Sequence, residues 1–128
     1  MRFEYNKDDK RRCEILGFTP NYMGGYSGFG AINIDQLNTL LEEKFIDPDE
    51  CQNCSPSTMV FKEFMEKYPG VTAHGYIIGP DRIDYRVTIE GLEYDGDFSR
   101  EMMEDFVDMF RHADDFIFNN RYLFCWYD

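Results

Sequence analysis

The sequence predicts an α+β fold, a two-layer sandwich in which helices cover one face of a mostly antiparallel sheet. Apolar residues recur at helical spacing in three segments and follow strand patterns in three others, in the order helix, helix, strand, strand, helix, strand. The chain has 128 residues, of which 43% are hydrophobic and 17% aromatic. This length fits one domain, and this composition supplies a core and excludes intrinsic disorder. We therefore expect a single α+β domain over residues 1–128.

The first predicted helix begins after Asn33, which can cap it, and Gln36 completes a capping-box pattern three residues later. The Asp-Pro pair at residues 47–48 ends this helix. Its apolar stripe consists of Ile34, Leu37, Leu40, Leu41 and Phe45. The second predicted helix begins at Ser55 and Pro56, where the missing proline N–H costs no hydrogen bond. Its apolar stripe consists of Val60, Phe61, Phe64, Met65 and Tyr68.

Two strands are predicted next, joined by a turn at Gly79-Pro80-Asp81. The first covers residues 71–78, and the second covers residues 82–90 with the clearest alternation in the chain. The apolar positions of the second strand are Ile83, Tyr85, Val87 and Ile89. Its polar positions are Arg82, Asp84, Arg86, Thr88 and Glu90. We expect one buried side and one solvent-facing side.

The third predicted helix is capped by Ser99, and Phe98 and Met103 fit a hydrophobic staple across its first turn. Its inner stripe consists of Met102, Met103, Phe106, Val107, Phe110 and Ala113. A last strand is predicted at residues 121–127, where nearly every residue after Arg121 is apolar or aromatic. A strand without a polar side is buried on both faces, or is covered on one face by a partner.

Residues 1–32 have the least regular pattern. Residues 13–18 are apolar enough for a short strand, whereas residues 21–30 hold too many glycines for regular structure. We expect this glycine- and aromatic-rich segment to pack on the body of the domain. The chain shows no signal-peptide pattern and no apolar stretch of membrane-spanning length, so we expect a cytoplasmic protein with its four cysteines reduced.

The charge of the chain is strongly acidic and unevenly distributed. Asp and Glu number 25 against 13 Lys and Arg, a net charge of −12. Residues 1–12 hold five basic and three acidic residues, so the remainder of the chain carries −14. Nucleic-acid binding depends on cationic groups that neutralise phosphates, so this balance excludes direct nucleic-acid binding, and it disfavours binding to anionic membranes.

The acidic surface predicts a protein-binding module that engages a basic partner, because negative patches steer association with basic surfaces. An inhibitor or immunity-type protein fits this description. In the most specific version of this hypothesis, the carboxylates mimic nucleic-acid phosphates and occupy the groove of a nucleic-acid-binding enzyme. The predicted partner-binding residues are Glu93, Asp95, Asp97, Glu101, Glu104, Asp105 and Asp108. The alternative is that the net charge has no binding function and only keeps the protein in solution.

Two further functions remain open from the sequence. One is a small-molecule or catalytic site that combines the glycine-rich loop at residues 24–30 with His74, Arg82 and Arg86, in which Asp81 or Asp84 orients His74 as a general base. The glycines of that loop are Gly24, Gly25, Gly28 and Gly30, and their spacing matches no nucleotide-binding fingerprint. The other is a homo-oligomer, such as a homodimer, in which a twin subunit covers the C-terminal strand.

No complete catalytic or metal-binding motif is present, so we expect no catalytic residue, no cofactor and no metal. Cys51 and Cys54 have the spacing of half a zinc site, but a second pair of ligands is missing. The acids from Glu93 to Glu104 have the length of a calcium loop, but Phe98 stands where that loop needs glycine.

Overall fold

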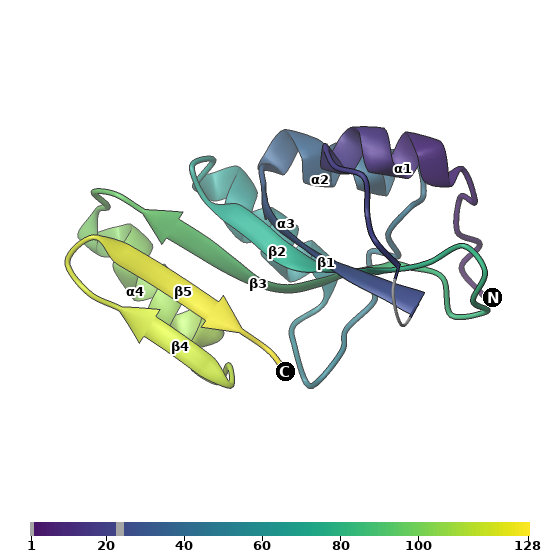
Figure 1. The fold of residues 1–128 in the computed structure, drawn as a ribbon. Coiled ribbons are helices and arrows are strands. Elements are labelled where there is room, and N and C mark those ends of the chain that lie inside the picture. The colour runs from purple at the N-terminus through teal and green to yellow at the C-terminus, as the bar shows by residue number, and fades with distance from the viewer. Residues whose placement is uncertain (1, 23–24) are drawn as a thin grey trace.

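A computed structural model describes residues 2–22 and 25–128 and confirms the predicted α+β class (Figure 1). The described residues form four helices and one five-stranded antiparallel sheet. The elements in chain order are α1 (Asp9–Leu16), β1 (Tyr26–Ile32), α2 (Ile34–Glu42), α3 (Thr58–Lys67), β2 (Thr72–Ile78), β3 (Val87–Asp95), α4 (Arg100–Phe110), β4 (Asp115–Phe118) and β5 (Tyr122–Trp126). No helix of the described chain is long and apolar enough to cross a membrane.

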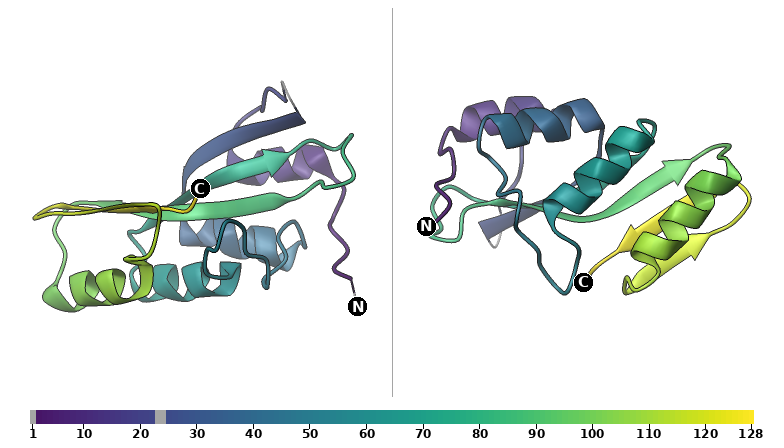
Figure 2. Two further views of the ribbon diagram at one scale, coloured as in Figure 1. Left: turned by 90° about the horizontal axis from the view of Figure 1, so that it is seen from below. Right: turned by 180° about the vertical axis from the view of Figure 1, so that it is seen from behind.

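The strands are ordered β1-β2-β3-β5-β4, and each neighbouring pair is antiparallel. Helices α2, α3 and α4 lie along one side of this sheet (Figure 2), and α1 packs beside α2. Over β3, β5 and β4 the other side carries no helix from the described residues (Figure 1). Over these three strands, helices therefore cover the sheet on one side only.

The side chains of β5 alternate between the covered side and the uncovered side of the sheet. Leu123 and Cys125 are fully buried in the core beneath the helices. Tyr122, Phe124 and Trp126 point to the opposite side and are only half-buried. We call this side of the sheet the open face. Cross-strand partners share a face, so the register also places on it Tyr26, Gly28, Thr72, His74, Tyr76, Ile78, Thr88, Gly91, Glu93, Asp95, Asp115 and Ile117. Of these residues, Ile78 and Thr88 are buried.

The predicted helix caps at Asn33 and Ser99 are confirmed. Asn33 and Gln36 form both hydrogen bonds of a capping box at the start of α2, and the Ser99 side chain accepts from the backbone N–H of Met102 in α4. Two predicted helix ends shift by several residues. Helix α2 stops at Glu42, before Lys44 adopts a φ of 66°, and α3 is preceded by Ser57 instead of Ser55.

The second predicted strand is displaced toward the C-terminus. Residues 82–86 form a loop, closed by backbone hydrogen bonds from Arg82 N–H to Gly79 O and from Tyr85 N–H to Arg82 O. Ile83, predicted to be buried, is 100% exposed in that loop. The alternation of residue types begins at residue 82, five residues before β3 starts at Val87, so periodicity misplaced the start of the strand.

The N-terminal predictions were wrong in two respects. Residues 13–16, expected in a strand, end helix α1, whose N-cap Asp8 accepts from the N–H of Arg11 and whose C-cap Gly17 has a φ of 81°. The glycine-rich residues 26–30 are not a loop but belong to β1, at one edge of the sheet. A bulge between Phe29 and Ile32 interrupts the pairing of β1 with β2.

Arg12 in α1 is a fully buried cation that joins helix α1 to the ends of two strands. Its guanidinium forms an ion pair with Asp9 at 2.8 Å and donates to the backbone oxygens of Ile78 at 2.9 Å and Arg86 at 3.3 Å. It also lies over the ring of Tyr85, 4.1 Å from the centroid. A buried charge is tolerated only when it is paired and hydrogen-bonded, and Arg12 satisfies both conditions.

We expect Arg12→Ala to lower the free energy of unfolding by about 3–5 kcal/mol, because Asp9 would lose its buried cationic partner and two backbone oxygens would each lose a charged donor. Urea unfolding measures the loss. Arg11→Ala is the matched control, because Arg11 is 42% exposed and forms a surface pair with Glu43, so its loss should be clearly smaller. Equal losses for the two variants would contradict the role of Arg12.

Candidate functional site

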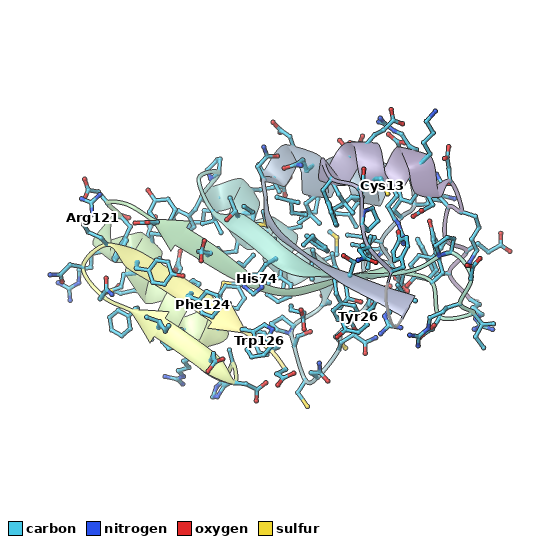
Figure 3. The ribbon with its side chains drawn as sticks, in the orientation of Figure 1. Cys13, Tyr26, His74, Arg121, Phe124 and Trp126 are labelled. Carbon is cyan, nitrogen blue, oxygen red and sulfur yellow. The ribbon has the colours of Figure 1, made fainter. Side chains whose placement is uncertain are left out.

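The open face carries a concentration of aromatic side chains. Figure 3 shows Tyr26, His74, Phe124 and Trp126 on the strands that form this side of the sheet. Tyr76 and Tyr122 share the same face by register. Aromatic side chains that remain accessible on a sheet without a covering layer are typical of a surface that binds another molecule.

Three of these side chains form a stacked row. The rings of Tyr122 and Phe124 lie 6.3 Å apart at an interplanar angle of 11°, and those of Phe124 and His74 lie 5.2 Å apart at 10°. Tyr122 and Phe124 belong to β5, whereas His74 belongs to β2, two strands away. The row therefore crosses the intervening strand β3 and presents flat rings in a fixed order. We call it the aromatic row.

The row can cross β3 because residue 91 is glycine. A Cβ atom on Gly91 would lie 1.8 Å from the carbonyl oxygen of Cys125 and 2.8 Å from Cε1 of His74. In the space left by that missing Cβ, His74 Nε2 lies 3.2 Å from the Cys125 oxygen. A carbonyl oxygen only accepts, so Nε2 carries the proton. Burial lowers the pKa of His74, and this hydrogen bond and the charge of Glu93 oppose the shift.

Two of the predicted partner-binding carboxylates border the aromatic row. Glu93 and Asp95 lie on β3, opposite Phe124 and Tyr122 of β5. The Tyr122 hydroxyl donates to Glu93 Oε2 at 2.5 Å. Burial and this hydrogen bond raise the pKa of Tyr122 to about 12. Asp95 is exposed and forms no ion pair within residues 2–22 and 25–128. Both carboxylates therefore add negative charge to the open face.

The other predicted carboxylates lie elsewhere, and most have cationic neighbours. Asp97, in the turn after β3, pairs with Arg121 at 2.9 Å. On α4, Glu104 pairs with Arg100 at 2.8 Å and Asp105 pairs with Lys67 at 2.8 Å. Glu101 lies 4.0 Å from the same lysine, whereas Asp108 is exposed and unpaired in the described chain. Helix α4 lies on the covered side of the sheet, so the structure does not bring the seven residues together (Figure 2).

The aromatic row lies near a hollow of about 500 Å³. We call this concave region the hollow. Residues from β1, β2, β3, β5, the loop between α2 and α3, the 79–86 loop and the last residue of the chain meet there. Its lining consists of Tyr26, Gly28, Asn53, Tyr76, Ile78, Arg82, Asp84, Arg86, Glu90, Trp126 and Asp128. The hollow thus combines aromatic rings with charges of both signs.

The alternative small-molecule site is only partly assembled. Gly28, Arg82 and Arg86 do line the hollow, but His74 does not. His74 contacts Phe124 and the Cys125 carbonyl, and the structure shows no hydrogen bond from it to Asp81 or Asp84, so the alternative in which an aspartate orients His74 gains no support. Gly24 lies outside the described residues.

The cysteines do not assemble a metal centre. Cys51 and Cys54 are exposed free thiols, and no group of three or more His, Cys, Asp or Glu residues in the described chain has the geometry to hold a metal ion. Burial raises the pKa of Cys125 to about 12, which keeps this core thiol protonated and unreactive.

Sequence reasoning missed Trp126, Tyr76 and Glu90 as neighbours in one site. The signal for Trp126 was present, because large aromatic residues occupy every second position of β5 and smaller apolar residues the positions between. Tyr76 alternates in the same way along β2. What the sequence lacks is the strand order, which brings β1, β2, β3 and β5 side by side.

Comparison of this chain with family models, curated proteins and solved structures found no match.

Gly91→Ala tests the crossing of the aromatic row. The new methyl group would collide with a backbone oxygen, so we expect a loss of about 1–3 kcal/mol in unfolding free energy. The His74 ring resonances should also shift in NMR spectra. Gly30→Ala is the matched control, since a Cβ at Gly30 meets no atom within 4 Å. A Gly91→Ala variant as stable as Gly30→Ala would disprove the close approach.

The lowered pKa of His74 predicts a pH dependence of stability. The unfolded chain takes up the proton near the ordinary value of 6.5, whereas the folded chain resists it. The stability that depends on a neutral His74 is therefore fully present above pH 6.5, and it is lost as the pH falls below that value. Urea midpoints measured from about pH 7.5 to about pH 5.5 should fall more in the wild type than in His74→Gln. His112→Gln, which replaces the other histidine of the chain at an exposed position, is the control variant.

Proposed function

We propose that this chain is an acidic protein-binding module that engages a basic surface of a partner protein through its open face. The observation that carries the proposal is the aromatic row on a sheet face without a covering helix, bordered by Glu93 and Asp95. An inhibitor or immunity-type protein works by such one-to-one engagement, and a nucleic-acid-binding enzyme is one class of partner that presents a basic surface.

The chemistry of the face fits a basic partner. Arginine and lysine side chains bind over aromatic rings, and the attraction strengthens when water is excluded. Carboxylates next to those rings neutralise the incoming cations, as Glu93 and Asp95 would. The net charge of −12 raises the rate of encounter with a positively charged surface. In this scheme the rings of the aromatic row contribute affinity, and the carboxylates make the face selective for basic partners.

Phosphate mimicry is a narrower form of the same proposal and has weaker support. A mimic of duplex nucleic acid needs carboxylates in a row at about one charge per 1.7 Å of axis. On α4 and in the turn before it, Asp97, Glu104 and Asp105 are each neutralised by a neighbouring cation within 2.9 Å. The proposal therefore rests on the open face and not on the acids of α4.

Self-association through the open face is less consistent with the charges. Two copies of the same face would bring Glu93 and Asp95 of one subunit toward the same carboxylates of the other, in chains that each carry −12. Light scattering at low salt should therefore report a monomer of 15.2 kDa. A dimer under these conditions would favour the oligomer alternative.

Binding of a fluorescent oligo-arginine peptide tests the proposed face. We expect Phe124→Ser and Asp95→Asn each to weaken binding by about twofold to fivefold, the effect of losing one partly exposed contact. Glu63→Gln, an exposed carboxylate on α3, is the charge-matched control and should bind like the wild type. Circular dichroism of each variant verifies the fold.

Two outcomes would overturn the proposal. Equal weakening by Asp95→Asn and Glu63→Gln would show that the peptide responds to net charge alone. A larger loss for Asp108→Asn than for both open-face variants would move the binding surface to α4.

A further inference from the structure

We propose that the hollow is a pocket for a single arginine side chain of the partner protein. The inference rests on the proposed function, because it identifies the group through which a basic partner is anchored to the open face. It concerns different residues from the aromatic row, so the two can be tested separately.

Aromatic rings from three strands line the hollow. Tyr26 of β1 and Tyr76 of β2 meet edge to face with ring centroids 6.5 Å apart, and Trp126 of β5 completes the set. Figure 3 places Tyr26 and Trp126 on neighbouring parts of the same face. Rings set at different angles offer a planar cation a surface to stack on and an edge to contact. The hollow of about 500 Å³ has room for one side chain and its displaced water.

The two cations that line the hollow are already matched by protein groups. Arg86 donates to the Tyr76 hydroxyl at 2.7 Å and forms an ion pair with the largely buried carboxylate of Glu50 at 3.2 Å. Arg82 donates to both carboxylate oxygens of Asp84, at 2.9 and 2.8 Å. These arginines are therefore components of the walls, and their charges are largely offset before a ligand arrives.

Two carboxylates in the lining have no cationic partner within the described residues. Neither Glu90 nor Asp128 takes part in an ion pair within the described residues. Burial raises the pKa of Glu90, a hydrogen bond from the Trp126 side chain opposes that shift, and the charge of Asp128 adds to it. Two like charges next to an indole ring raise the energy of the empty hollow, and a bound cation would relieve that cost.

The backbone explains why Glu90 lines the hollow. His74 pairs with Gly91 and Gly75 pairs with Ile89, so Glu90 is an extra residue in β3, a bulge with no partner on β2. Its carbonyl oxygen accepts instead from the N–H of Tyr127, just after β5. A bulge redirects a side chain out of the regular alternation, and such positions are common next to binding sites.

Arginine fits this site better than lysine. The guanidinium group is planar, stacks on aromatic rings and carries five N–H donors that can reach two carboxylates at once. The lysine ammonium is a compact, strongly hydrated charge that gains less from the rings. Two carboxylates and three rings around one hollow therefore match a guanidinium in both shape and charge.

Trp126 provides a direct reporter, because it is the only tryptophan of the chain and lines the hollow. The probe is a short capped peptide with one arginine between apolar residues. We expect its addition to change the Trp126 emission saturably. The same peptide with citrulline, which has the shape of arginine without its charge, should give no saturable change. The lysine version should bind about threefold or more weakly.

Glu90→Gln should weaken binding of the arginine peptide about tenfold, because the amide keeps the shape of the side chain and removes its charge. Asp128 is exposed, so Asp128→Asn leaves the core intact and should also weaken binding, which keeps the test valid if Glu90→Gln affects folding. Glu63→Gln on α3 is the matched control and should bind like the wild type.

The outcomes separate this inference from the proposed function. Wild-type affinity in both Glu90→Gln and Asp128→Asn, or equal binding of the citrulline peptide, would overturn the arginine pocket. The proposed function would survive that result if Phe124→Ser still weakened binding of oligo-arginine. Equal binding of the lysine peptide would overturn the preference for arginine. Absence of binding by both the arginine peptide and oligo-arginine would overturn both proposals.

Discussion

Alternation along β5 divides its residues between two environments, and the rest of the molecule depends on that division. Leu123 and Cys125 are fully buried against the helices, whereas Tyr122, Phe124 and Trp126 lie on a face that no helix of the described chain covers. Because α2, α3 and α4 all pack on the same side, β5 buries one set of side chains and presents the other. The aromatic row and the hollow are both consequences of this one-sided packing.

Local departures from regular sheet geometry turn the open face into a shaped surface. Gly91 lets the His74 ring lie across β3 and stack on Phe124, which a Cβ atom would prevent. The bulge at Glu90 places a carboxylate beside Trp126 in the hollow. A regular strand would present neither feature, so two adjacent residues of β3 determine much of the character of both sites.

Much of the fold could be predicted from the sequence where local patterns decide it. The caps at Asn33 and Ser99 and the apolar C-terminal strand are confirmed because capping and periodicity act over a few residues. Arg12 is an example of what local patterns cannot predict. It lies in a charged segment, and its burial depends on hydrogen-bond partners up to 74 positions away in the sequence. For the candidate site, the carboxylates Glu93 and Asp95 were predicted from charge alone, whereas the hollow depends on strand order, which no local pattern contains.

Amide chemical-shift mapping shows directly whether a basic ligand binds the open face. The isotope-labelled chain is titrated with unlabelled oligo-arginine peptide, and the perturbed amides are placed on the fold. We expect the largest shifts on β2, β3 and β5, around His74, Glu93 and Phe124. Shifts centred on α4, or spread evenly over every acidic segment, would contradict binding at the open face.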